Sequence, residues 1–193
     1  MDLLSLIKNR RTIRKYKDEK VSEKVIQSLL EAGRWAPSAH NLQPWKFLVI
    51  DRKDNITKIA DIMDKKADEL FSGFNIVMRD TAKNIRQAQA LLLVYGTGAV
   101  TKKFTKFGPP YAEIGNTYEI QSVANAIENI LLYAKELNIG IAWYGMGLFC
   151  EHEISSLFRQ KDRLLAILSL GYADESPSAL TRKELKEIVQ FIR

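Results

Sequence analysis

Hydrophobic side chains recur at helical spacing in several stretches of the chain. Residues 22–35 place an apolar stripe on one face of a helix that Ser22 can cap and that Pro37 would end. Residues 118–137 keep the 3.6-residue period over about five turns, which predicts the longest helix of the protein. We expect further helices over residues 2–9, from Asn55 to about Gly73, over 76–86 and over 151–158.

Short apolar runs between these helices predict strands. Residues 45–51 are rich in aromatic and β-branched side chains, and residues 90–95 are apolar throughout, as in a central strand covered on both faces. Residues 163–170 predict a further strand, and residues 141–147 form a short apolar run interrupted by glycines. The alternation of strands and helices indicates a layered α/β or α+β domain with four or five strands.

Two stretches have a weaker or irregular pattern. Residues 99–115 are basic and turn-rich, and Gly108-Pro109-Pro110 predicts a rigid corner, so we expect a loop or lid there. Thr181-x-x-Glu184 has the form of a capping box and predicts a final helix that bears Leu185, Ile188, Val189 and Ile192. No repeat or linker divides the sequence, so residues 1–193 are expected to form one domain, with residues 62–115 as its variable lid region.

Composition and charge limit the classes of protein. A chain of 193 residues with 46% hydrophobic composition suits one domain with a buried core. The net charge of +6 and the pI near 9.3 fit a nucleic-acid partner, an anionic cofactor or no specific partner. The basic residues of the N-terminal stretch lie among apolar and acidic ones, without a zinc-finger or aromatic RNA-binding motif. We therefore favour a local anion site and expect no nucleic-acid partner.

Several other classes of site lack the residues they need. The sequence has no long apolar run that predicts a membrane span and no N-terminal apolar block typical of a secretory signal, so we expect a cytoplasmic protein. Cys150 is the only cysteine, which excludes an intramolecular disulfide, and His40 and His152 are too few for a zinc site, so no metal is expected. Neither a Rossmann glycine motif nor a P-loop is present.

A cluster of arginines suggests where an anion binds. Arg10, Arg11 and Arg14 lie within five residues, together with Thr12. Guanidinium groups and a hydroxyl can hold a phosphate by charge-assisted, forked hydrogen bonds. A lone cluster of this kind is more often a solvated basic turn, because charged side chains are mostly exposed.

Three further stretches have candidate chemistry. The segment from Pro37 to Trp45 is compatible with a rigid helix-to-strand connection, but Ser38, Asn41 and Gln43 supply more donors and acceptors than a turn needs. Residues 138–145 have the pattern of a helix end followed by a buried strand, and the glycine at position 145 would permit close approach of the main chain to a ligand. Two cationic side chains near the start of the final predicted helix are unfavourable there unless an anion is close; they are Arg182 and Lys183.

Together, the arginine cluster and the segment 36–45 resemble the N-terminal signature of the nitroreductase family of flavin enzymes, in residue type, order and spacing. The resemblance implies the α+β nitroreductase-like fold, with a mixed, mainly antiparallel sheet of four to five strands flanked by helices, in an intertwined homodimer. It also implies FMN as cofactor. The residues that the resemblance assigns to the phosphate and ribityl chain are Arg10, Arg11, Thr12 and Arg14, with Arg182 and Lys183 near the phosphate or the ring O2.

For the flavin ring, the resemblance implies contacts from two stretches. Pro37, Ser38 and Asn41 would border the ring edge, mostly of the flavin bound across the dimer interface. The run Ala142, Trp143, Tyr144 and Gly145 would lie along one face of the ring, with the backbone of Gly145 near N5. A backbone donor at that position would stabilise the charge that develops on reduction.

The function expected from the resemblance is hydride transfer from NADH or NADPH through flavin N5 to an electron-poor small molecule, such as a nitroaromatic or a quinone. Because donor and acceptor would share one cleft, ping-pong kinetics are expected, and no side chain need act as a nucleophile. A flavin store or sensor without NAD(P)H turnover is the alternative, and a basic nucleic-acid-binding module is a third possibility.

Overall fold

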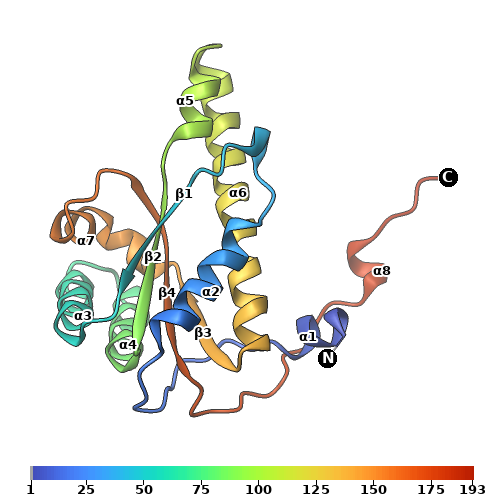
Figure 1. The fold of residues 1–193 in the computed structure, drawn as a ribbon. Coiled ribbons are helices and arrows are strands. Elements are labelled where there is room, and N and C mark those ends of the chain that lie inside the picture. Colours follow the sequence, from blue (N-terminus) through green and yellow to red (C-terminus); the bar gives the residue numbers. More distant parts are fainter. Residues whose placement is uncertain (1) are drawn as a thin grey trace.

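The computed structural model describes residues 2–193 and shows a four-stranded sheet between two layers of helices (Figure 1). The strands follow the order β1-β2-β4-β3, and all neighbouring pairs are antiparallel. The strands are β1 (Trp45–Ile50), β2 (Ala90–Gly96), β3 (Ile139–Tyr144) and β4 (Arg163–Tyr172). The helices are α1 (Leu3–Asn9), α2 (Glu23–Arg34), α3 (Lys53–Ala67), α4 (Phe74–Gln87), α5 (Ala99–Thr105), α6 (Pro109–Glu136), α7 (Glu151–Leu157) and α8 (Leu185–Ile188), with 3-10 turns η1 (Ala39–Asn41) and η2 (Met146–Cys150). The predicted α+β class with four to five mainly antiparallel strands is confirmed, and the sheet has four strands.

The sheet buries a separate hydrophobic cluster on each face. Because side chains alternate along a strand, Leu92 and Val94 of β2 face α2 and α6, whereas Leu91 and Leu93 face α3 and α4. Figure 1 shows α3, α4 and α7 on one side of the sheet and α2 and α6 on the other. Coverage of both faces explains why β2 is an uninterrupted apolar run.

Residues 99–115, which the sequence predicted as a loop or lid, are helical. α5 occupies Ala99–Thr105 and α6 begins at Pro109. Prolines at the first positions of a helix lose no intrahelical hydrogen bond and have a suitable φ, so Pro109 and Pro110 start α6 rather than prevent it. The turn at Gly108, with φ of 105°, therefore joins two helices.

A buried carboxylate attaches α5 to α6. Glu119 of α6 is 5% exposed and accepts hydrogen bonds from the backbone N–H groups of Gly98 (2.5 Å), Val100 (3.2 Å) and Thr101 (3.1 Å). These are N–H groups at the start of α5 that the helix itself leaves without partners. No helix within residues 2–193, α6 included, is both long and apolar enough to span a membrane.

The segment between α1 and α2 lies extended against β3 and the end of β4. The N–H of Ile13 donates to the carbonyl of Ile141 at 3.0 Å. Strand glycines make this close packing possible: a Cβ on Gly140 would come within 2.6 Å of Ile13, and a Cβ on Gly171 within 2.6 Å of Tyr16. The glycines of β3 and β4 therefore leave the room in which the arginine segment packs on the sheet.

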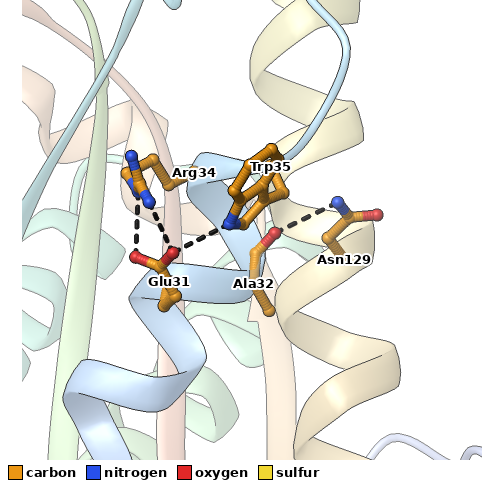
Figure 2. Close-up of polar contacts among 5 residues, drawn as sticks. All are labelled: Glu31, Ala32, Arg34, Trp35 and Asn129. Atoms are coloured by element: carbon orange, nitrogen blue, oxygen red, sulfur yellow. Dashed lines mark hydrogen bonds and ion pairs between the residues drawn. The ribbon is translucent and has the colours of Figure 1, made fainter.

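The end of α2 is fixed on α6 by side-chain contacts (Figure 2). Asn129 of α6 donates from Nδ2 to the carbonyl of Ala32 at 3.1 Å. Glu31 accepts hydrogen bonds from Arg34 at 2.6 and 2.9 Å and from the indole Nε1 of Trp35 at 2.8 Å. Trp35 is thus held in one orientation although it is 74% exposed.

Residues 178–193 extend from the body of the protein as an exposed arm (Figure 1). The predicted final helix is wrong in length and start, because α8 spans only Leu185–Ile188. Its capping box consists of Glu184 and Glu187, not of Thr181 and Glu184. All side chains of the arm are exposed, so no buried face stabilises a longer helix.

Candidate functional site

A cavity of about 580 Å³ lies at the end of β3, between the N-terminal segment and α4. The end of β3 contributes Trp143, Tyr144 and Gly145, and the N-terminal segment contributes Arg14 and Lys15. Its volume is that of a typical small-molecule site. The cavity is completed by Val77, Asp80, Thr81, Lys83, Asn84 and Gln87 of α4 and by Met146.

The lining of this cavity is basic. The cations Arg14, Lys15 and Lys83 outnumber the acid, Asp80. Glu175 accepts hydrogen bonds from the backbone N–H groups of Arg14 (2.5 Å) and Lys15 (3.1 Å). Glu175 therefore holds the main chain of the N-terminal segment. The cavity keeps an excess of positive side-chain charge that can face a ligand.

The cavity also offers a planar surface and accessible main chain. Trp143 is 43% exposed although it belongs to a strand. A Cβ on Gly145 would meet no atom within 4 Å, so the main chain there faces open space. Asn84 and Gln87 add amide donors and acceptors from α4. An anionic ligand with a planar, polar ring matches this set of groups.

Tyr144 connects the cavity to buried hydroxyl groups. Ser169 Oγ lies 3.5 Å from the Tyr144 hydroxyl and 2.6 Å from the Tyr16 hydroxyl. The Tyr16 hydroxyl also donates to the carbonyl of Ile13 at 2.6 Å. Burial raises the pKa of both Tyr16 and Tyr144, so both phenols keep their protons well above neutral pH.

The arginine cluster is divided between two cavities. Arg10 and Arg11 line a second cavity of about 700 Å³, whereas Arg14 lines the cavity at the end of β3. Thr12 forms a parallel bridge with Ile141 of β3, and Tyr16 forms an antiparallel bridge with Ala173, just past the end of β4. Arg10 and Arg11 share their cavity with residues at the start of β3, and Arg14 shares its cavity with residues at the end of the strand. The three arginines, which the sequence had suggested for one anion site, therefore do not line a single cavity.

The second cavity is basic as well. Lys17 and Lys135 line it together with the two arginines, against the single acid Glu175. Arg11 donates to the carbonyls of Lys8 (2.7 Å) and Arg10 (2.8 Å), where its charge is favourable at the C-terminal end of α1. Thr12, which lines neither cavity, is half-buried.

The loop that follows α2 lines a different hollow, against α6. Pro37 and Ser38 contribute to that hollow, and Ser38 Oγ accepts a hydrogen bond from the N–H of Gln43 at 3.0 Å. His40, Asn41 and Gln43 have φ values of 52°, 54° and 46°. Histidine and asparagine adopt such values more readily than most residues, and positive φ at residues other than glycine is frequent at functional sites.

Three other predicted residues do not reach the cavity at the end of β3. Ala142 is fully buried in the sheet. Arg182 and Lys183 lie on the exposed arm, and neither lines the two basic cavities.

The contribution of α4 was missed at the sequence level. The sequence predicted a helix over residues 76–86, and its polar positions were the available signal. Which way that polar face turns depends on how α4 packs on the sheet through Met78, Ala82 and Ile85. Asn84 and Lys83 could therefore not be assigned to the site from periodicity alone.

Comparisons with known proteins identify the family of the chain. The profile of the Nitroreductase family matches residues 7–172. A protein of Archaeoglobus fulgidus with the provisional name NADH dehydrogenase/NAD(P)H nitroreductase is 30% identical over 177 residues, which cover 89% of this chain and 85% of that protein. Iodotyrosine deiodinase of Thermotoga neapolitana is 30% identical over 193 residues, which cover 95% of each protein.

A solved structure shares the fold over nearly its whole length. The crystal structure of a provisionally named nitroreductase from Desulfovibrio desulfuricans in complex with FMN is 26% identical, with a TM-score of 0.76, and the match covers 100% of this chain and 98% of that one. Since the family profile spans most of the sequence and the fold agrees, the chain belongs to the nitroreductase family.

Proposed function

We propose that the protein is an FMN-dependent oxidoreductase that takes hydride from NADH or NADPH and reduces an electron-poor organic acceptor. The observation that carries the proposal is the basic cavity at the end of β3, where Arg14, Trp143 and Gly145 meet the polar face of α4. The names of the relatives support it, since one is named for NADH and NAD(P)H and one solved neighbour contains FMN.

The residues present suit FMN. Trp143 and the open main chain at Gly145 would accommodate the ring at the end of β3. Arg14 would face the polar ring edge, and Arg10 would hold the phosphate beside the start of the strand. Thr12, which lies between Arg10 and Arg14 in the sequence, would bind the ribityl chain with its hydroxyl. An extended ligand placed along β3 can thus engage both basic cavities.

When bound, FMN supplies the hydride and electron transfer, so the chain need not provide a nucleophile. The chain's own contribution is to position the ring and to place positive charge and a main-chain donor at its edge. Arg14 and the N–H groups near Gly145 are the groups available for this role. Fixed donors of this kind stabilise the negative charge that reduction creates.

The proposed acceptor is an electron-poor aromatic compound, such as a nitroaromatic or a quinone. It would occupy the cleft after the nicotinamide leaves, which gives ping-pong kinetics. The similarity to a protein named iodotyrosine deiodinase makes an aryl halide the second class of acceptor to test.

We also infer that two copies of the chain complete the site. Large apolar side chains are exposed on the arm, among them Leu185 (74%) and Phe191 (81%), and Trp35 is held exposed on the body. Exposed apolar groups of this extent mark an interface, and β1 leaves one edge of the sheet open for an extended segment. A partner would bring Ser38 and Asn41, which line no part of the cavity in the single chain, toward its flavin.

Formation of the dimer would also place the arm against a folded surface. In the proposed assembly Pro37 borders the ring together with Ser38, and Arg182 and Lys183 approach the phosphate. Arginine and lysine side chains at that end would add to the charge already supplied by Arg10.

The test is the visible absorption spectrum of the purified protein after incubation with FMN and removal of free flavin, repeated anaerobically with NADH and with NADPH. A retained flavin spectrum that either nucleotide bleaches is the expected result. A retained flavin that neither nucleotide reduces would instead favour a flavin store or sensor. A protein that retains no FMN contradicts the proposal.

A further inference from the structure

A buried hydroxyl network joins three separate parts of the chain. Tyr16 belongs to the N-terminal segment, Ser169 to β4 and Tyr144 to the end of β3. Ser169 is fully buried, and Tyr16 and Tyr144 are 8% and 6% exposed. Because Ser169 Oγ lies 2.6 Å from the Tyr16 hydroxyl and 3.5 Å from the Tyr144 hydroxyl, one group bridges the arginine segment and the cavity-lining strand.

Ser169 is the hydroxyl that contacts both tyrosines of this network. Tyr16 has a short contact, 2.6 Å, to the carbonyl of Ile13, which can only accept. Ser169 donates from Oγ to the Tyr144 hydroxyl at 3.5 Å, and in its 2.6 Å contact with the Tyr16 hydroxyl either oxygen can be the donor. Apolar contacts are non-directional, whereas a satisfied buried network of this kind specifies one relative position of its members.

The network fixes the N-terminal segment relative to the end of β3, and these two parts serve the two ends of the proposed cofactor site. The Ile13 carbonyl lies between Thr12 and Arg14, so holding it fixes the residues on either side. The backbone hydrogen bond from Ile13 to Ile141 holds the segment near the middle of β3. The hydroxyl network holds the same segment relative to the end of the strand, where Tyr144 lines the cavity.

We propose that Ser169 is a positioning residue that sets the placement of the phosphate-binding segment relative to the ring-binding end of β3. The inference rests on the FMN site proposed above. The affinity of a ligand that contacts both ends of the site at once depends on this placement. The affinity of a ligand that contacts mainly the ring end does not.

Ser169→Ala tests the proposal through two flavins. Riboflavin has the ring and ribityl chain of FMN without the phosphate, and quenching of flavin fluorescence gives both dissociation constants. We expect the preference for FMN over riboflavin to fall about tenfold, with the riboflavin constant changed less than about twofold. Equal losses for the two ligands, or no loss for either, overturn the proposal.

Tyr144→Phe removes the other end of the bridge without emptying space in the core. It should lower the FMN preference in the same way as Ser169→Ala. Because both changes break one network, the double variant should lose little more than either single variant. Fully additive losses would mean that the two residues act separately, which contradicts the proposal.

Two matched controls separate positioning from general loosening of the core. Ser155→Ala and Tyr95→Phe also remove buried hydroxyl groups, but these have no hydrogen-bond partner within residues 2–193. Both controls should keep the wild-type preference for FMN, and a drop equal to that of Ser169→Ala overturns the inference. If the wild-type protein binds neither flavin, the proposed function itself fails and this inference fails with it.

Discussion

Arg14 lines the cavity at the end of β3, whereas its neighbours in the arginine cluster line the cavity beside the start of the strand. Arg14→Gln should therefore weaken FMN binding while the fold is retained. A hydrogen bond to a charged group contributes about 1.5–3 kcal/mol, so the dissociation constant should rise roughly 10- to 150-fold. Fluorescence titration with FMN measures this change.

The control for this substitution is an arginine on another surface. Arg52 is exposed at the start of α3 and lies 4.0 Å from Asp54. Arg52→Gln removes the same charge from the protein without touching either basic cavity, so it should leave FMN affinity at the wild-type value. Equal losses for the two variants would show that overall charge, not a local contact, attracts the cofactor.

Two glycines at the ends of neighbouring strands should respond differently to an added methyl group. In Gly171→Ala the new Cβ would lie 2.6 Å from the Tyr16 ring, and overpacking of this kind costs about 1–3 kcal/mol. In Gly145→Ala the Cβ would meet no atom within 4 Å, so stability should change by less than about 0.5 kcal/mol. Urea unfolding of both variants tests the pair, and similar losses would contradict the packing described here.

The sequence identified candidate site residues better than it identified which of them line the same cavity. Arg14 and Gly145, from distant parts of the chain, line one cavity, and the motifs had suggested both. The motifs could not show that Arg10 lies in another cavity, because that depends on the segment running beside β3. Nor could they show the face that α4 presents, since packing of its apolar side chains on the sheet decides it.

At the level of elements, periodicity predicted the structure wherever burial is strong. The apolar runs at residues 90–95 and 163–170 are the two central strands, and residues 118–137 lie almost wholly within α6. The prediction was wrong between α5 and α6, where residues typical of turns occur. Pro109 and Pro110 begin α6 instead of forming a loop. It was wrong again at the final helix, where the pattern exists but no surface of the single chain buries it.

The junction of α5 and α6 should depend on Glu119. Glu119→Gln replaces an acceptor of three backbone N–H groups by an amide that presents its own donors to them. We expect a loss of roughly 2–3 kcal/mol in the free energy of unfolding. Amide hydrogen exchange should also become faster over residues 99–105.

A second glutamate on the same helix provides the control. Glu128 of α6 is exposed, so Glu128→Gln should change neither the stability nor the exchange of α5. If Glu119→Gln exchanges like the wild type over residues 99–105, the carboxylate does not hold α5 in place.

For the whole molecule, the exposed arm is the feature that the single chain leaves without a packing surface. We expect the wild-type protein to be a dimer and removal of residues 178–193 to give a monomer with weakened FMN binding, because the partner's contribution to each site is lost. Light scattering coupled to size exclusion measures the first effect and fluorescence titration the second.

Substitutions that keep the length of the arm refine this test. Leu185→Ser combined with Phe191→Ser removes two exposed apolar side chains and should also favour the monomer. Lys186→Ala, on the same arm, should leave the dimer intact. A truncated protein that remains dimeric would show that the arm is not part of the interface.

The way the N-terminal segment docks also determines when the pocket can form. Tyr16 bonds to Ser169, which lies 153 positions further along the chain. On the ribosome the arginine segment is therefore synthesised well before β4, to which Tyr16 bonds. Contacts between residues so distant in sequence close slowly. A nascent chain halted before β4 can have α2 formed, but the two basic cavities arise only after β4 has emerged, because β3 and Tyr16 both bond to that strand.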